Sequence, residues 1–456
     1  MMKVYNSLSR RVEPLVPAKD NEIRLYTCGP TVYNFAHIGN FRAYAFEDVL
    51  RRTILFNGMK IRQVMNLTDV DDKTIRGTNA AGVALTDYTA PYKKAFFEDL
   101  DTLNIQKAEV YPAATDHIPE MIELVGRLVE KGVAYRSEDG SVYFNVRKFP
   151  GYGKLAHIDF DAQRTGARCA ADEYDKENVG DFALWKAWEE SDGPVGWDSP
   201  WGRGRPGWHI ECSAMSMKYL GETFDLHTGG IDNLFPHHEN EIAQAEAATG
   251  KPFVSTWMHC AHLKVNGEKM SKSAGNFFTL RDLEEKGWSG REIRYVLVAA
   301  HYRQGLNFAF SALEDARRSL ARIDQCVSRA TDGEIPGWAK ARAEAFTEAM
   351  NDDLNTPRAL AELFGLVRDA NTKGAGGTLA AFRRMDEVLG FVFPRDGGKK
   401  EAEIPPEVRK LADERAAARK AKDWALSDRL RDEIAAAGWI VKDSRDGQTL
   451  CSKSGI

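Results

Sequence analysis

Residues 26–42 decide the fold of this chain, and they read Tyr-Thr-Cys-Gly-Pro-Thr-Val-Tyr-Asn-Phe-Ala-His-Ile-Gly-Asn-Phe-Arg. Residues 23–26 alternate apolar and polar side chains, which predicts a short strand. Apolar residues recur at helical spacing from Phe41 onward, so a helix is expected to begin near Gly39. A helix that starts at the end of a strand presents unpaired N–H groups and a positive dipole end, which suit a phosphate. The stretch therefore predicts a nucleotide-binding turn, although a histidine and a glycine at such a turn are more often structural.

Composition excludes several classes of protein. The 456 residues have room for two to four domains, and 43% hydrophobic with 28% charged residues is ordinary for a soluble globular protein. The formal net charge of −5 excludes a globally basic nucleic-acid binder, so any RNA contact must be local. The start resembles no secretory signal, no apolar run reaches membrane-spanning length, and the six cysteines are scattered. These features predict a cytoplasmic protein with reduced thiols and no membrane segment.

A second motif lies far along the chain, where residues 269–273 read Lys-Met-Ser-Lys-Ser. Together with His37-Ile38-Gly39-Asn40 it resembles the two ATP motifs of class I aminoacyl-tRNA synthetases. Four longer sequence motifs narrow the resemblance to the cysteinyl-tRNA synthetase family. These motifs are residues 26–42, 66–73 (Asn-Leu-Thr-Asp-Val-Asp-Asp-Lys), 205–213 (Arg-Pro-Gly-Trp-His-Ile-Glu-Cys-Ser) and 235–241 (Phe-Pro-His-His-Glu-Asn-Glu). The words occur in the family's order, and the resemblance extends from about residue 2 to the C-terminal tail.

This resemblance implies an α/β fold with a split Rossmann-like nucleotide-binding domain, an inserted domain, an α-helical bundle and a small C-terminal domain. The expected parts are the first half of the catalytic domain (1–115), the inserted connective domain (116–205), the second half of the catalytic domain (206–260), the Lys-Met-Ser-Lys-Ser loop with a region that contacts the tRNA stem (261–310), the helical bundle (311–395) and a C-terminal anticodon-binding domain (404–456).

Local patterns agree with this division. Residues 60–67 and 224–227 are strand-like and end in polar clusters, where open α/β sheets bind ligands. The acidic cluster at 68–72 could equally be a solvated turn. Pro236 and Gly250 predict the first residue and the end of a helix. Apolar residues at helical spacing predict the bundle from about residue 310 to 390.

The last segment carries a basic run with a tryptophan close behind it. Arg415, Arg419, Lys420 and Lys422 precede Trp424. Basic residues beside an aromatic side chain suit an RNA backbone and its bases. A solvated helix face fits the composition nearly as well.

The resemblance implies how ATP, with Mg²⁺, is bound. His37 and the helix starting near Asn40 would hold the phosphates, while Lys269 and Lys272 would lie on a mobile loop over the leaving pyrophosphate. Positioning and electrostatic stabilisation are the main tools for joining two anions. Asn40 departs from the family, which has a second histidine there. An amide can still donate to a phosphate oxygen, but it is never cationic.

The resemblance also implies substrate pockets. The residues expected near adenosine are Gly229, Gly230 and Asp232, and those expected around the amino acid are Thr31, Trp208 and His227. On local pattern alone, the glycines fit a tight structural turn equally well. The run His227-Thr228-Gly229-Gly230 differs from the family's usual His-Gly-Gly-Gly, so this turn is expected to be altered.

A metal site follows from the resemblance and not from spacing, because its residues are far apart in the sequence. Cys28, Cys212, His237 and Glu241 match the four family ligands of one zinc ion per chain. Two thiolates with an imidazole and a carboxylate suit zinc. In the family the metal accepts the thiolate of the substrate cysteine. A buried free thiol is the commonest fate of any single cysteine.

The resemblance implies a cysteine–tRNA ligase that uses ATP, cysteine and tRNA(Cys), expected to be a monomer without membrane contact. One alternative is a same-fold ligase that joins cysteine to an amino sugar, which would not need the distal RNA-binding region. The other is a catalytically silent RNA-binding relative, which the intact Lys-Met-Ser-Lys-Ser word and the complete set of metal ligands oppose.

Overall fold

The computed structural model describes residues 1–158, 180–270, 275–394, 405–421, 423–444 and 447–452. The chain divides into two compact units. The first comprises Met1–Leu280 and Gly290–Phe393, and the second comprises Arg281–Ser289 and Pro394–Ile456. Both motifs that predict ATP binding fall within the first unit.

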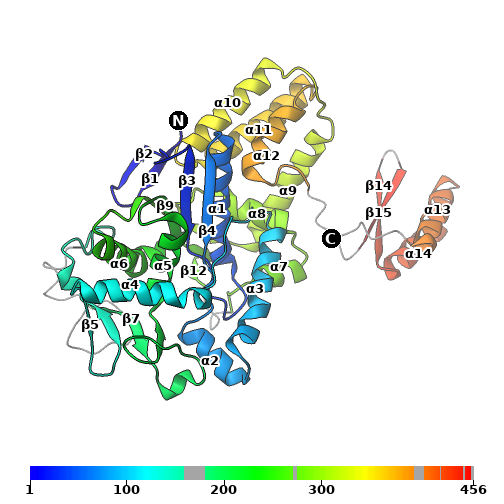
Figure 1. The fold of residues 1–456 in the computed structure, drawn as a ribbon. Helices are drawn as coiled ribbons and strands as arrows, with labels where there is room; N and C mark the ends of the chain where they lie inside the picture. The colour runs from blue at the N-terminus through cyan, green and yellow to red at the C-terminus, as the bar shows by residue number, and fades with distance from the viewer. Residues whose placement is uncertain (159–179, 271–274, 395–404, 422, 445–446, 453–456) are drawn as a thin grey trace. The chain divides into compact units, whose positions relative to one another are not determined.

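A four-stranded parallel sheet forms the centre of the first unit (Figure 1). Its order is β10-β9-β3-β4, with bounds Val254–Cys260, Phe224–Gly230, Glu22–Thr27 and Lys60–Met65. Tyr26 of β3 lies opposite Val64 on one side and His227 on the other, so segments 200 residues apart in sequence are neighbours. The carboxyl ends of the strands share one edge, the place where such sheets bind ligands. The predicted Rossmann-like sheet is confirmed.

Helix α1, Ile38–Phe56, follows the predicted nucleotide turn and packs on this sheet. It is buried on nearly every side because the sheet covers one face while α8 (Gly290–Ala299) and α12 (Leu379–Leu389) cover others. Charged side chains on the helix are therefore paired inside the protein. Asp48, for example, binds Arg52 at 2.7 Å and Arg294 at 2.5 Å.

An antiparallel sheet is inserted between β4 and β9, as the prediction requires. Its strands pair in sequence order, and β5 to β8 span Ala134–Arg136, Val142–Phe144, Phe182–Ala187 and Gly204–Pro206. Three helices precede it: α2 (Asp72–Ala81), α3 (Leu85–Thr102) and α4 (Ile118–Glu130). The boundaries 116–205 themselves stay a prediction.

The acidic cluster after β4 has structural partners. Buried Asp69 binds Lys93 Nζ at 2.6 Å and accepts from the backbone and hydroxyl of Thr115. Asp71 caps the N-terminus of α2, and Asp72 pairs with Lys186 and Arg205 of the inserted sheet. Asp72 therefore joins α2 to the inserted sheet, whereas Asp69 and Asp71 hold the segment around α2 and α3.

Two helices flank β9 in sequence, α5 (Trp208–Leu220) and α6 (Glu239–Thr249). Gly250 ends α6 with a left-handed φ of +74°, as predicted. The prediction that Pro236 is the first helical residue is confirmed. Phe235 is extended, with φ −141° and ψ 132°, as a residue preceding a helix is, and helical backbone continues from Pro236 through His238 into α6.

The rest of the first unit supports the loop motif and forms the predicted bundle. A small sheet of β11 (Leu263–Val265), β12 (Glu268–Lys269) and β13 (Leu306–Phe308) carries the start of the loop. Besides α12, the bundle consists of α9 (Phe310–Val327), α10 (Gly337–Asn351) and α11 (Thr356–Lys373). The N-terminal strands β1 (Lys3–Asn6) and β2 (Arg11–Pro14) form a hairpin. Helix α7 (Leu280–Glu285) belongs, apart from Leu280, to the second unit.

The second unit has its own small core. Helices α13 (Pro406–Lys420) and α14 (Trp424–Ala436) pack with strands β14 (Trp439–Ser444) and β15 (Gly447–Ser452), and Ile434 is fully buried between them. Arg415 of the predicted basic run is only 2% exposed and donates to Gln448, so it does not belong to an exposed basic face. Lys422 lies outside the described residues.

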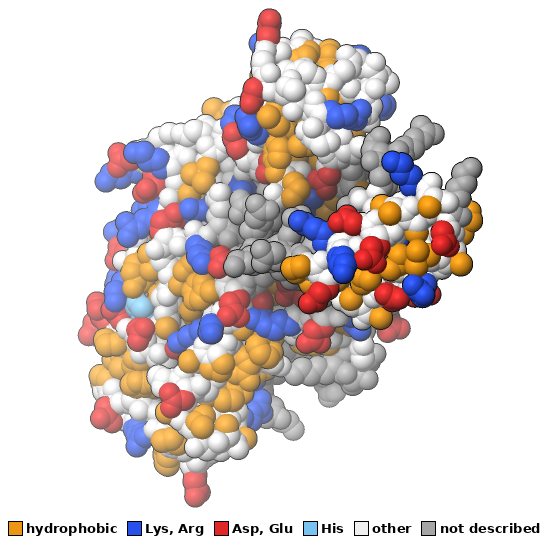
Figure 2. Space-filling model, turned by 90° about the vertical axis from the view of Figure 1, so that its right-hand side faces the viewer, with side chains coloured by type: hydrophobic (Ala, Val, Ile, Leu, Met, Phe, Trp, Pro, Cys, Tyr) orange, Lys and Arg blue, Asp and Glu red, His pale blue; other side chains and the backbone are white. Residues whose placement is uncertain are grey.

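Charges of both signs are interspersed on the face shown in Figure 2. This agrees with the formal net charge of −5. None of the helices in the described part of the chain combines the length and apolar content needed to cross a bilayer.

Candidate active site

Helix α1 begins at the predicted phosphate-binding turn with a reciprocal cap. Nδ1 of His37 accepts from the backbone N–H of Asn40 at 3.2 Å, and Oδ1 of Asn40 accepts from the backbone N–H of His37 at 3.1 Å. Burial lowers the pKa of His37, so the ring is neutral near pH 7. Because Nδ1 is an acceptor, the proton sits on Nε2. Asn40, the residue that departs from the family, thus helps to orient one imidazole N–H donor at the helix start.

Residues before and after the undescribed segment 271–274 contact this helix start. The backbone N–H of Ile38 donates to the carbonyl of Phe278 at 3.0 Å, and the ring of Phe277 meets His37 edge to face at 5.0 Å. A Cβ added to Gly39 would lie 2.6 Å from Cε of Met270, so Met270 occupies the space that glycine leaves. Lys272 lies outside the described residues, and Lys269 is described only by its backbone in β12.

The four predicted metal ligands meet at the carboxyl edge of the parallel sheet. Cys28 follows β3, Cys212 lies on α5, and His237 and Glu241 lie at or just before the start of α6. Their ligand atoms all lie within 4.8 Å of one another, and Nε2 of His237 is 3.1 Å from Oε1 of Glu241. The structure therefore brings together residues that spacing alone could not assemble.

A second set of four overlaps the first. Cys28, His227, His238 and Glu241 also have ligand atoms within 4.8 Å of one another. Nε2 of His238 is 3.3 Å from Sγ of Cys28, and Nε2 of His227 is 3.0 Å from Oε2 of Glu241. The sequence prediction missed His238, whose only signal was its position beside His237 in a pair of histidines.

Further side chains orient the two adjacent histidines. Nδ1 of His237 lies 2.8 Å from Nδ1 of His209, and Nδ1 of His238 lies 2.9 Å from Nε2 of His259. His259 is held in turn by the hydroxyl of Ser7 at 2.7 Å. Each pairing leaves Nε2 facing the cluster. Metal-binding imidazoles in proteins are commonly held by their other nitrogen in this way.

Burial dominates the electrostatics of the cluster. It raises the pKa of the Glu241 carboxyl and, with the hydrogen bond to Cys212, that of the Cys28 thiol. It lowers the pKa of His237 and His238 well below the usual value and that of His227 to about 3. Neutral imidazole nitrogens are ready to coordinate, while a divalent cation would favour the ionised thiols and carboxylate. The donor set of sulfur, nitrogen and oxygen fits zinc.

Two of the three residues predicted to surround the amino acid contact this cluster. The ring of Trp208 stacks on His237 with centroids 4.4 Å apart, and 44% of Trp208 remains exposed. His227 is buried between Tyr26 and Trp257, with centroids 5.1 and 4.6 Å away. Thr31 lies in the loop after Cys28 and forms a β-bridge with Thr68.

The residues predicted to lie near adenosine follow at the carboxyl end of β9. A Cβ on Gly229 would lie 2.9 Å from both Asn233 and His238, so close packing requires glycine there. Asp232 lies in the short turn Ile231–Asn233, and its charge partly offsets the effect of burial on the pKa of His37. Asp232 therefore lies close enough to the start of α1 to influence the charge of His37.

Thr228, the altered residue of this turn, has a partner that the sequence did not reveal. Its hydroxyl donates to Oε1 of Glu47 at 3.0 Å. Glu47 lies on α1 and is 1% exposed, and its Oε2 has no hydrogen-bond partner in the described part of the chain. Burial raises the pKa of Glu47 to about 8. The altered turn is thereby tied to α1 through a buried carboxyl group.

Comparisons with known proteins give the family. A family model described as tRNA synthetases class I (C) catalytic domain matches residues 14–318. The cysteine–tRNA ligase of Protochlamydia amoebophila (strain UWE25) is 51% identical over 468 residues, covering 98% of this chain and 97% of that relative. The chain belongs to the cysteine–tRNA ligase family. A second cysteine–tRNA ligase, from Chlamydia pneumoniae, is 49% identical over 462 residues and covers 97% of this chain and 96% of its own length.

Two further family models match the C-terminal part of this member of the cysteine–tRNA ligase family, and a solved structure shares its fold. A DALR domain model matches residues 345–393, and a cysteinyl-tRNA ligase anticodon binding domain model matches residues 401–450. The solved structure of Mycobacterium tuberculosis methionyl-tRNA synthetase in complex with methionyl-adenylate is similar with a TM-score of 0.58 and 17% identity, over 81% of this chain and 88% of that one. The class I synthetase fold is therefore confirmed.

Proposed function

We propose that this chain activates cysteine with ATP to cysteinyl-adenylate and pyrophosphate, and then transfers the cysteinyl group to the 3′-terminal adenosine of tRNA(Cys). The family supports this reaction. The observation that carries it is the cluster of thiols, imidazoles and carboxyl at the sheet edge that also holds the capped start of α1. Joining cysteine to ATP needs one site that selects a thiol beside another that selects phosphates.

Within the cluster, Cys28, Cys212, His237 and Glu241 are the proposed ligands of one zinc ion per chain. They supply two sulfurs, one nitrogen and one oxygen, whereas the overlapping set supplies only one sulfur. When bound, zinc supplies a Lewis acid for the substrate sulfur, which the harder hydroxyl of serine matches poorly. Shape alone would be a weak filter, since small differences in a pocket give only about 10–200-fold discrimination. Trp208, His227 and Thr31 then position the rest of the amino acid.

On the ATP side, Nε2–H of His37 and the backbone N–H groups at the start of α1 donate to the phosphates. Asn40 keeps the His37 ring in place through the cap. Gly229, Gly230 and Asp232 would approach adenosine, and Mg²⁺ would accompany the phosphates. Lys269 and Lys272 would neutralise charge that develops on the leaving pyrophosphate. Support for the loop's place comes from its flanks, because Met270 and Phe277 both meet the start of α1.

The C-terminal unit favours tRNA over the other acceptors. The anticodon binding model matches it, and Trp424 is 58% exposed with the guanidinium of Arg419 6.0 Å above its ring. An exposed aromatic side chain beside a cation suits stacking with an unpaired base. An amino-sugar acceptor gives no reason for such a unit. We further propose that the enzyme is a cytoplasmic monomer.

The proposed ligand set is tested by comparing Cys212→Ser with His238→Gln in protein loaded with cobalt in place of zinc. If Cys212 is a ligand, Cys212→Ser loses about half of the sulfur-to-cobalt absorption, while His238→Gln keeps it. Added cysteine should increase this absorption and added serine should not.

The matched variants also separate the two ligand sets. Unchanged absorption in Cys212→Ser, with loss of metal from His238→Gln, would assign the overlapping set instead. If metal-free protein activates cysteine normally in ATP–pyrophosphate exchange and still rejects serine, the proposed role of zinc is wrong.

A further inference from the structure

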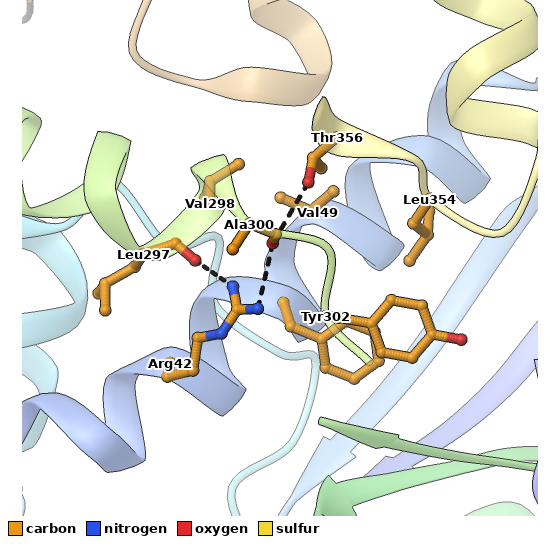
Figure 3. Close-up of a pocket in the computed structure, with 9 residues that line it drawn as sticks. Arg42, Val49, Leu297, Val298, Ala300, Tyr302, Leu354 and Thr356 are labelled. Carbon is orange, nitrogen blue, oxygen red and sulfur yellow. Dashed lines mark hydrogen bonds between the residues drawn. The ribbon is translucent and has the colours of Figure 1, made fainter. Parts of the chain in front are cut away.

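Helix α1 carries a buried arginine two residues after the motif at 37–40. Arg42 is 2% exposed, and its guanidinium donates to three backbone carbonyls and to no carboxylate among the described residues. Two acceptors, Leu297 and Ala300 at 3.1 Å, are shown in Figure 3, and the third is His301 at 2.8 Å. Leu297 belongs to the last turn of α8, whose carbonyls lack helical partners. Arg42 therefore caps the C-terminus of α8 and holds the chain that leaves it.

The next turn of α1 packs against the same segment, residues 297–302. The ring of Phe46 stacks on Tyr302 with centroids 4.4 Å apart and an interplanar angle of 12°. The hydroxyl of Thr356, the first residue of α11, approaches the carbonyl of Ala300 at 3.4 Å. Two consecutive turns of α1 and the start of a bundle helix thus fix residues 297–302.

This segment supports the strands from which the Lys-Met-Ser-Lys-Ser loop starts. The carbonyl of Tyr302 accepts from Ala261 at 2.8 Å, and the N–H of Leu306 donates to His262 at 3.1 Å. Strand β13 then pairs with β11, which pairs with β12 and so reaches Lys269. The hairpin turn between β11 and β12 is tied to β13 as well, because Asn266 donates to the carbonyl of Phe308 at 3.0 Å.

The far end of the loop is held by the first turn of the same helix. Ile38 donates to the carbonyl of Phe278, and His37 forms a β-bridge with Thr279. Both ends of the loop are therefore held in place by α1. The C-terminal end contacts the helix directly, and the N-terminal end is connected to it through Arg42 and residues 297–308. Any tilt of α8 relative to α1 would move the N-terminal end of the loop while its C-terminal end stayed in place.

We propose that Arg42 is a positioning residue for ATP activation: it sets the distance between the phosphate-binding start of α1 and the base of the Lys-Met-Ser-Lys-Ser loop. The inference rests on the proposed function, in which the loop lysines act on pyrophosphate. Its consequence is selective. The geometry on the ATP side depends on Arg42, whereas the cysteine cluster is held by other contacts, those of β3, β9, α5 and α6.

The test compares Arg42→Met, which keeps an apolar side chain of similar reach, with Arg42→Lys and with the control Arg51→Met. Arg51 is also a buried arginine of α1, but it binds Glu109 at 2.6 Å and Gln63, away from the loop. In cysteine-dependent ATP–pyrophosphate exchange, Arg42→Met should lower kcat/KM for ATP about 100-fold, since small displacements of reacting groups have effects of this size. The KM for cysteine should stay within about twofold, because that pocket is untouched. Arg42→Lys should recover part of the loss.

A purely structural role predicts a different result. If Arg42→Met changes the KM values for ATP and cysteine in parallel, or if Arg51→Met gives the same ATP-selective loss, the positioning role is wrong. Transfer from preformed cysteinyl-adenylate to tRNA should be close to wild type in Arg42→Met, because pyrophosphate has left by then. If Arg42→Met does not fold, Phe46→Leu is measured instead, because Phe46 holds the same segment. A fall in kcat/KM for ATP with an unchanged KM for cysteine supports the proposal, and the absence of such a fall overturns it. Failure of the proposed function is recognised separately, since wild-type protein would then show no cysteine-dependent exchange or Lys272→Ala would leave it unchanged.

Discussion

The buried carboxyl of Glu47 offers a test of the electrostatics in this site. Glu47→Gln keeps the size of the side chain and an oxygen that can accept from Thr228, but it removes the group that titrates. Burial raises the pKa of Glu47 from 4.5 to about 8 because the carboxylate loses water and gains only one hydroxyl donor in the described structure. The protonated form therefore favours folding.

The sign and size of the effect on stability follow from the difference between the unfolded and folded pKa values of Glu47. With a folded pKa above the unfolded one, the contribution of Glu47 to stability is fully present below about pH 4.5 and is lost as the pH rises through about 8. At about 1.4 kcal/mol per pH unit, the loss between these values is at most about 5 kcal/mol. Unfolding entropy scales with chain length, so for a unit of this size the melting temperature changes by about 1–2 °C per kcal/mol.

The measurement is the melting temperature of wild type and Glu47→Gln between pH 5 and 9. We expect the variant to gain about 5 °C relative to wild type across this interval, with the increase spread between pH 5 and about pH 8 and little further gain above pH 8. Glu47→Leu is the control, because it also lacks the titrating group but leaves the Thr228 hydroxyl without its acceptor. Parallel pH profiles for wild type and Glu47→Gln would show that Glu47 is ionised in the folded protein, and the reasoning from burial would then be refuted.

Three further predictions concern catalysis and assembly of the site. Lys272→Ala should slow adenylate formation by about two to three powers of ten, or about 2.7–4 kcal/mol, with little change in the KM for cysteine, and near wild-type pyrophosphate exchange would contradict its role. Truncation after Pro394 should leave adenylate formation intact but weaken tRNA binding and flatten its salt dependence, and unchanged tRNA affinity would make the second unit merely structural. Gly29→Ala should reduce metal content and solubility together, because the added Cβ would collide with the backbone oxygen of Asn66 and displace the neighbouring Cys28. A soluble variant with full metal content would contradict this prediction.

Local patterns in the sequence determined those features that depend on neighbouring residues. The strand–turn–helix around His37, the strand at 60–67 and the bundle helices were predicted because alternation and helical periodicity are local signals. Family membership followed from long words in a fixed order. Pro236 was likewise a sufficient local signal, because the chain is extended at Phe235 and helical from Pro236 onward.

Tertiary structure alone decided which side chains meet. Cys28 and His238 are 210 positions apart, and only the parallel pairing of β3 with β9 places them 3.3 Å from each other. The Thr228–Glu47 pair and the carbonyl contacts of Arg42 carry no sequence signal, because a buried polar residue on a helix looks the same in sequence whatever acceptor it finds. Sequence periodicity reports which face of an element is buried, but partners are set by the packing of elements distant in the chain, where unpaired buried polar groups are too costly to leave unmatched.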